Sequence, residues 1–96
     1  MKAYELLYML PATAEDEVKD AVSGRIETAI VQGNGKVEST ENWGIRKLAY
    51  QIGDLTDADY TLVEFSADES SIAELDRVLR INDAVVRHMI TARPVK

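Results

Sequence analysis

The chain has 96 residues and a net charge of −6, with 46% hydrophobic and 29% charged residues. This length suits one hydrophobic core, so we expect a single domain over residues 1–96, and the composition excludes a disordered chain. The sequence contains no cysteine, which excludes disulfides, thiolate metal sites and cysteine nucleophiles. The N-terminal apolar run is too short for a signal peptide or a membrane span, so we expect a cytoplasmic protein that does not contact membranes.

In chain order, the sequence predicts a strand, a helix, two strands that form a hairpin, a second helix and a last strand. We expect these elements at residues 3–10, 14–32, 36–52 and 59–66, then from 66 to 81–83, and at 84–92. The order βαββαβ is typical of the ferredoxin-like α+β fold. We therefore expect a four-stranded antiparallel sheet with both helices on one face and the other face open to a partner.

Several local signals set the expected boundaries of these elements. Thr13 is a suitable N-cap for the first helix, and Ser66 with Glu69 forms a possible capping box for the second. The Gly-Asn-Gly run at residues 33–35 supplies the positive backbone angles that end a helix. The apolar phase of the long strand changes between Ile45 and Leu48, which predicts a β-bulge near residues 44–47.

The charge is unevenly distributed along the chain. Residues 1–75 hold six Lys and Arg and fifteen Asp and Glu, a net charge of −9, whereas residues 76–96 hold five and two, a net charge of +3. Affinity for nucleic acid depends on cations that gather locally and displace counterions from phosphates. The acidic total argues against a protein that binds nucleic acid with its whole surface, but a local basic face remains compatible with it.

Some cations have ordinary explanations and others do not. Arg77 and Arg80 suit the negative end of the second helix dipole, and Arg80 is spaced to pair with Asp76. Arg46 and Lys47 are neighbours in a strand, so their side chains point to opposite faces of the sheet. Only one of these two is easily explained as a solvated side chain, which favours a contact for the other.

Three further residues have both a structural and a functional interpretation. His88 is the only histidine, and a solvated or core-edge position is favoured over a general base. Trp43 and Tyr50 are favoured as core residues or cross-strand pairs over platforms for base stacking. Neither a histidine metal cluster nor a catalytic constellation is present, so we expect no enzyme activity, no metal and no cofactor.

Several segments closely resemble the bacterial small-subunit ribosomal protein S6 family, in order and over the whole chain. The main one is the run GIRKLAYQI at residues 44–52, and the others are Tyr4-Glu5, the run LRIND at residues 79–83, and Val86-Arg87. The resemblance implies the same ferredoxin-like fold that the periodicity predicts. It also implies a structural protein of the small ribosomal subunit, which binds the central domain of 16S rRNA with ribosomal protein S18 as a heterodimer during assembly.

The resemblance also implies sites for these contacts, with a few cations that meet phosphates. It places rRNA contacts on Lys2, Arg46, Arg80, Arg87 and Arg93. It places contacts with rRNA or the protein partner less firmly on Trp43, Lys47 and Tyr50. No small-molecule substrate is expected, and no role that needs a long C-terminal tail is expected because the sequence ends two residues after Pro94.

Two other functions remain open from the residues alone. One is a ligand-sensing or regulatory ferredoxin-like module that forms homodimers edge to edge, with residues 54–59 lining a small-molecule site. The other is a small enzyme of the dimeric α/β-barrel kind, with a pocket on the open sheet face and His88 as its base.

Overall fold

The computed structural model of the chain describes residues 2–52 and 55–93, with the side chains of residues 49–52 and 55 left out. The expected hairpin turn at residues 53–54 and the strand-ending Pro94 lie outside the described residues. The observed elements are β1 (Lys2–Pro11), α1 (Asp16–Gln32), β2 (Lys36–Ile52), β3 (Leu55–Ala67), the short 3₁₀ helix η1 (Glu69–Ser71), α2 (Ile72–Arg80) and β4 (Arg87–Ala92).

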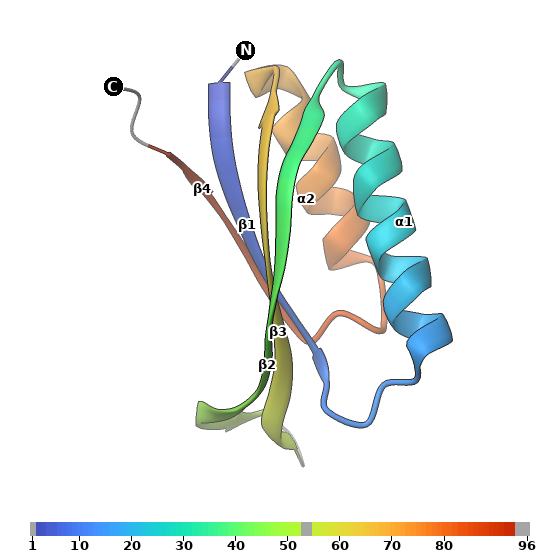
Figure 1. Cartoon of the computed structure of the whole chain (residues 1–96), viewed down its shortest axis with the longest axis vertical. Coiled ribbons are helices and arrows are strands. Elements are labelled where there is room, and N and C mark those ends of the chain that lie inside the picture. Colours follow the sequence, from blue (N-terminus) through green and yellow to red (C-terminus); the bar gives the residue numbers. More distant parts are fainter. Residues whose placement is uncertain (1, 53–54, 94–96) are drawn as a thin grey trace.

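The four strands form one antiparallel sheet in the order β2-β3-β1-β4. Both helices pack against the same face of this sheet, and no described helix or strand covers the other face (Figure 1). The expected ferredoxin-like fold is therefore confirmed. The side chains of the open face therefore come from one layer of four strands, with β2 and β4 at its two edges.

The core lies between the sheet and the helices, and strand alternation explains its composition. Alternate residues of β1 and β3 point toward the helices and are buried, as expected for a half-covered sheet. Tyr4 stacks on Phe65, with ring centroids 5.6 Å apart. The buried apolar cluster consists of Tyr4, Leu6, Tyr8, Leu10, Val22, Ile26, Ile30, Val63, Phe65, Ala67, Leu75 and Leu79.

The two predicted helix caps are wrong. The first helix begins two residues later than expected, with Glu15 rather than Thr13 at the N-cap, because the backbone first makes a turn in which Ala14 N donates to Pro11 O at 2.9 Å. The capping box from Ser66 to Glu69 does not form, because β3 continues through Ala67 and pairs with the start of β1. Strand pairing thus outcompetes the local capping signal.

The last strand is shorter than expected and the third is longer. Residues 84–86, expected as the start of this strand, lie instead in a turned segment before β4, where Asn82 Oδ1 accepts a hydrogen bond from Ala84 N at 3.0 Å. Such a bond mimics a backbone turn. The third strand begins at Leu55, because β2 and β3 pair again beyond the last bulge, with Ile52 opposite Leu55.

The long strand β2 is irregular at three points, between Val37 and Ser39, between Asn42 and Gly44, and between Lys47 and Ile52. Pairing is regular across residues 44–47, where the sequence predicts the bulge. The middle bulge instead lies directly before this run, and Gly44 takes a positive φ of 80° there. The prediction of a bulge is therefore right in kind but displaced toward the N-terminus.

Candidate macromolecular interface on the open sheet face

The open face has an apolar centre built by the alternate residues of three strands. In β1, Leu7 and Met9 point away from the helices, and directly opposed residues of an antiparallel pair share a face. Leu62 and Met89 lie opposite Leu7 and therefore flank it on this face. Met89 is 57% exposed, so a large apolar side chain of this face meets solvent in the isolated chain.

A shallow hollow of about 190 Å³ lies over this centre. Its walls are Glu5, Leu7, Trp43, Leu62, Met89 and Thr91. Trp43 is 38% exposed, so the interpretation of this residue as a core residue is wrong. Because Trp43 is the extra residue of the middle bulge, its ring lies at the margin of the open face.

Arg46 lies beside Trp43 at the margin of the open face. Its guanidinium carbon lies 5.8 Å from the centroid of the Trp43 ring, a cation–π distance. Arg46 is opposite Ala58, and Lys47 is opposite Asp57, so the two neighbours point to opposite faces as expected. The pair therefore does not form one site, and Arg46 alone belongs to the open face.

Arg87 lies at the same end of the open face. It is opposite Met9, which in turn is opposite Tyr60, and Tyr60 is opposite Gly44. Among the described side chains, no carboxylate lies within ion-pairing distance of Arg46 or Arg87. This end of the face therefore carries two arginines whose charge no described acid offsets.

The other predicted cations have acidic partners. Arg93 binds Glu64 at 3.0 Å and also binds Glu38, which holds its side chain across the open face. Lys2 Nζ lies 2.9 Å from a carboxylate oxygen of Glu69, and this hydrogen bond raises the pKa of Lys2. These residues lie at the end of the sheet where β1 starts and β4 ends (Figure 1).

Arg80 makes the expected pair with Asp76, at 3.3 Å and on an exposed helix surface. Exposed ion pairs of this kind contribute about 0–1 kcal/mol, so a phosphate can displace one of them at small cost. The side chain of Tyr50 lies outside the described residues. The structure therefore brings Trp43 and Arg46 together on β2, places Arg87 at the same end of the open face on the opposite edge strand β4, and leaves Lys2, Arg80 and Arg93 elsewhere.

His88 is on the opposite face from the one that the enzyme alternative requires. It is opposite the buried Tyr8 and points toward α2, where its Nε2 lies 2.7 Å from Asp76 Oδ1. The hydrogen bond from His88, with the charges of His88 and Arg80, outweighs burial and lowers the pKa of Asp76. His88 joins the edge strand to the helix, and a pocket on the open face with His88 as its base is excluded by this geometry.

The ligand-sensing alternative relies on the acids of residues 54–59. Asp54 lies outside the described residues. Asp59 is 5% exposed, and its two oxygens are bound to Asn42 and Lys19, each at 2.9 Å. Its carboxylate is thus occupied by the protein itself.

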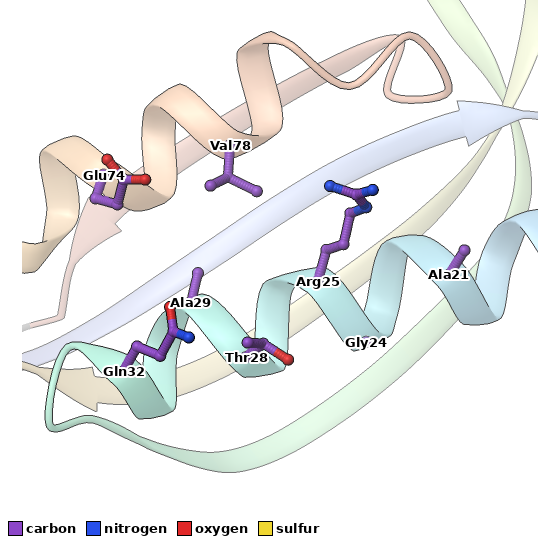
Figure 2. A pocket seen from close by; sticks show the side chains of 8 residues that line it. All are labelled: Ala21, Gly24, Arg25, Thr28, Ala29, Gln32, Glu74 and Val78. Carbon is purple, nitrogen blue, oxygen red and sulfur yellow. The ribbon is translucent and has the colours of Figure 1, made fainter.

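A second hollow, of about 430 Å³, lies between the outer sides of α1 and α2 (Figure 2). Its polar groups include Arg25, which reaches into the gap between the helices, and Glu74. The carboxylate of Glu74 already binds Arg77 through two hydrogen bonds of 2.6 and 3.0 Å. Across the part of the chain that the structure describes, no cluster of acidic or histidine side chains could hold a metal, and no helix could cross a membrane.

Fold and surface together define a small ferredoxin-like domain with an uncovered, partly apolar sheet face. The family model described as ribosomal protein S6 matches residues 3–92. The chain therefore belongs to the ribosomal protein S6 family, which is a family of ribosomal proteins and not of enzymes. This membership agrees with the resemblance carried by residues 44–52.

Individual relatives support the same family. The small ribosomal subunit protein bS6 of Alkaliphilus oremlandii is 41% identical over 90 residues, 94% of this chain and 95% of that protein. The protein of the same name from Desulforamulus reducens is 37% identical with the same coverage. The crystal structure of 30S ribosomal protein S6 from Thermotoga maritima superposes with a TM-score of 0.87 at 26% identity, over 96% of this chain and 87% of that chain.

The fold alone is shared more widely. The C-terminal domain of the MgtC protein from Mycobacterium tuberculosis matches with a TM-score of 0.65 at 9% identity, over 97% of this chain and 88% of that chain.

The apolar residues of the open face, Leu7, Leu62 and Met89, were not among the predicted contacts. Their alternation with buried neighbours was the signal that could have identified them.

Proposed function

We propose that this protein is a structural component of the small ribosomal subunit that binds the central domain of 16S rRNA together with ribosomal protein S18. The observation that carries the proposal is the open sheet face, with its exposed apolar centre and two uncompensated arginines at one end. Its relatives are named as small-subunit ribosomal proteins, which supports this function and a cytoplasmic location on the ribosome.

The two parts of the face suit two kinds of partner. The apolar centre around Leu7, Leu62 and Met89 suits a protein surface, because removal of apolar area from water is favourable by about 25 cal/mol per Å² before the costs of association are counted. Arg46 and Arg87 suit phosphates, since guanidinium groups bind phosphate oxygens with paired hydrogen bonds. We assign the centre to S18 and the arginine end to rRNA.

The remaining predicted cations differ in how firmly acidic side chains of this protein already hold them, and this sets their proposed contribution to RNA binding. Lys2 and Arg80 have exposed acidic partners that rRNA phosphates can replace. Arg93 is held by two carboxylates, so its contribution to RNA binding is proposed to be the smallest. Trp43 is proposed to contact S18 at the margin of the hollow, and Lys47 and Tyr50 are proposed to contact either partner.

Filter binding of a central-domain rRNA fragment tests this function. The affinity is measured with and without S18 across a salt series. We expect weak binding by the protein alone, tighter binding with S18, and a logarithmic salt dependence of about 0.9 per phosphate contacted on a duplex. Equal affinity with and without S18, or binding that does not depend on salt, contradicts the proposal.

A further inference from the structure

The bulge that carries Trp43 is fastened by the side chain of Asn42. Its Nδ2 donates to Asp59 Oδ1 at 2.9 Å and lies 3.2 Å from Thr61 Oγ1, while its Oδ1 accepts a hydrogen bond from Gly44 N at 3.1 Å. Asn42 therefore binds the neighbouring strand with one end of its amide and the residue beyond Trp43 with the other. The backbone on both sides of Trp43 is fixed by one side chain.

The partner of Asn42 is itself immobilised. Asp59 is 5% exposed and Thr61 is 8% exposed, and Lys19 of α1 holds the second oxygen of Asp59 at 2.9 Å. A buried carboxylate is costly unless all its bonds are made, so Asp59 has a narrow choice of positions. The cluster of Lys19, Asp59, Asn42 and Thr61 therefore connects helix α1 through β3 to the bulge in β2.

A β-bulge needs additional hydrogen bonds of this kind to fix its conformation. The extra residue of a β-bulge is left out of the ladder of hydrogen bonds, so the ladder does not fix its orientation. Gly44, with its φ of 80°, makes the sharp change of direction, and the Asn42 amide closes it. The ring of Trp43 is then placed against the hollow and under the guanidinium of Arg46.

We propose that Asn42, held by Asp59, is a positioning residue that presents Trp43 and Arg46 on the open face, although Asn42 itself belongs to the helix side of the sheet. This role rests on the proposed function, because it concerns the surface assigned to S18 and rRNA. Asn42 lies opposite Thr61, which is buried toward the helices, so it acts on the partners only through Trp43 and Arg46.

The first test uses the fluorescence of the free protein, since Trp43 is its only tryptophan. We expect Asn42→Ala to shift the emission of Trp43 to the red and to increase its quenching by acrylamide, because the ring becomes more solvated. Asn82→Ala is the matched control, as it removes the same kind of side-chain bond to a backbone N–H in the turn before β4. Unchanged emission in folded Asn42→Ala overturns the proposal.

The second test measures affinity for S18 and for the rRNA fragment. We expect Asn42→Ala to weaken binding about fivefold, the effect of losing one hydrogen bond. We expect Asp59→Asn to leave the emission of Trp43 unchanged, because the new side chain retains an oxygen that accepts the hydrogen bond from Asn42. If Trp43→Ala and Arg46→Ala leave binding intact, the proposed function of this face fails. If they weaken binding and Asn42→Ala does not, the positioning role alone fails.

Discussion

Nη1 of Arg93 lies 3.0 Å from Oε2 of Glu64, so the residue after the last strand is joined across β1 to β3. The same guanidinium also binds Glu38 of β2. One arginine thus connects three strands and both edges of the sheet on its open face. Because two carboxylates offset its charge, Arg93 differs from Arg46 and Arg87, although the sequence gives no reason to separate the three.

This difference predicts distinct effects on RNA binding. Arg46→Ala and Arg87→Ala are each expected to lower the logarithmic salt slope by about 0.9, the value for one phosphate on a duplex. Arg93→Ala is expected to lower the slope by less, because two carboxylates already offset the charge of Arg93 and it therefore neutralises less phosphate charge. Salt series of filter binding measure all three, and an equal loss of slope for Arg93→Ala and Arg46→Ala is the contrary result.

Arg93 should contribute more to stability than the other two. We expect Arg93→Ala to lower the free energy of unfolding by about 1 kcal/mol, since it removes two partly exposed charged hydrogen bonds. Arg87→Ala, which removes an exposed arginine without a described acidic partner at the start of β4, is the control and should change it by less than about 0.5 kcal/mol. Urea denaturation provides both values, and a larger loss in Arg87→Ala contradicts the prediction.

Substitution by alanine should have opposite effects on stability at two glycines, Gly24 and Gly33. A Cβ at Gly24 in α1 has no atom within 4 Å, so Gly24→Ala should stabilise the protein by about 0.5–1 kcal/mol through the helix preference of alanine. A Cβ at Gly33 would lie 2.4 Å from Cβ of Ser71, so Gly33→Ala should destabilise it by about 1–3 kcal/mol. Thermal and urea denaturation check the signs, and a stabilised Gly33→Ala protein refutes the assigned contact.

Acid stability should depend on Asp59. Burial alone raises the pKa of this carboxyl, but the hydrogen bonds from Asn42 and Lys19 and the charge of Lys19 outweigh burial and hold the pKa below its usual 3.8. A lowered pKa in the folded state gives a stabilisation that is complete above the unfolded-state pKa and is lost as the pH falls through the folded-state pKa. Asp59 therefore stabilises the fold at neutral pH and ceases to do so in acid.

The corresponding experiment compares unfolding at about pH 7 and about pH 2.5. Asp59→Asn should be less stable than the unmodified protein at the higher pH, and this deficit should shrink at the lower pH. Asp57→Asn, the same change two positions away in β3, controls for net charge. A deficit that is constant with pH shows that the carboxylate charge of Asp59 does not stabilise the fold.

The fold was predictable from the sequence because it follows from repeated, mutually consistent signals. The alternation of buried Thr61, Val63 and Phe65 with Tyr60 and Leu62 specifies a half-covered strand, and the structure has the same alternation. The order of elements then specifies two helices on one face. Features of this kind depend on many residues, so no single competing interaction changes them.

The remaining features depend on which residues meet across the fold. Thr13 and Ser66 are good helix caps locally, but a turn and a strand pairing take precedence at these positions. The bond from Asn42 to Asp59 requires the register of β2 on β3, and that register is shifted by bulges whose positions the sequence gives only approximately. The candidate site was therefore predictable as a set of cations, but not as the particular end of the open face.

We propose that the open sheet face, and no other apolar surface of the described residues, mediates the S18-dependent binding of rRNA. Met89 and Val31 make a matched pair, because they are 57% and 58% exposed, on the open face and on α1 respectively. The most direct test measures how much S18 increases rRNA affinity in Met89→Glu and in Val31→Glu. We expect Met89→Glu to lose at least about tenfold of this increase, as for a residue at the centre of an interface, whereas Val31→Glu keeps it. An undiminished increase in Met89→Glu would show that the open face does not bind S18.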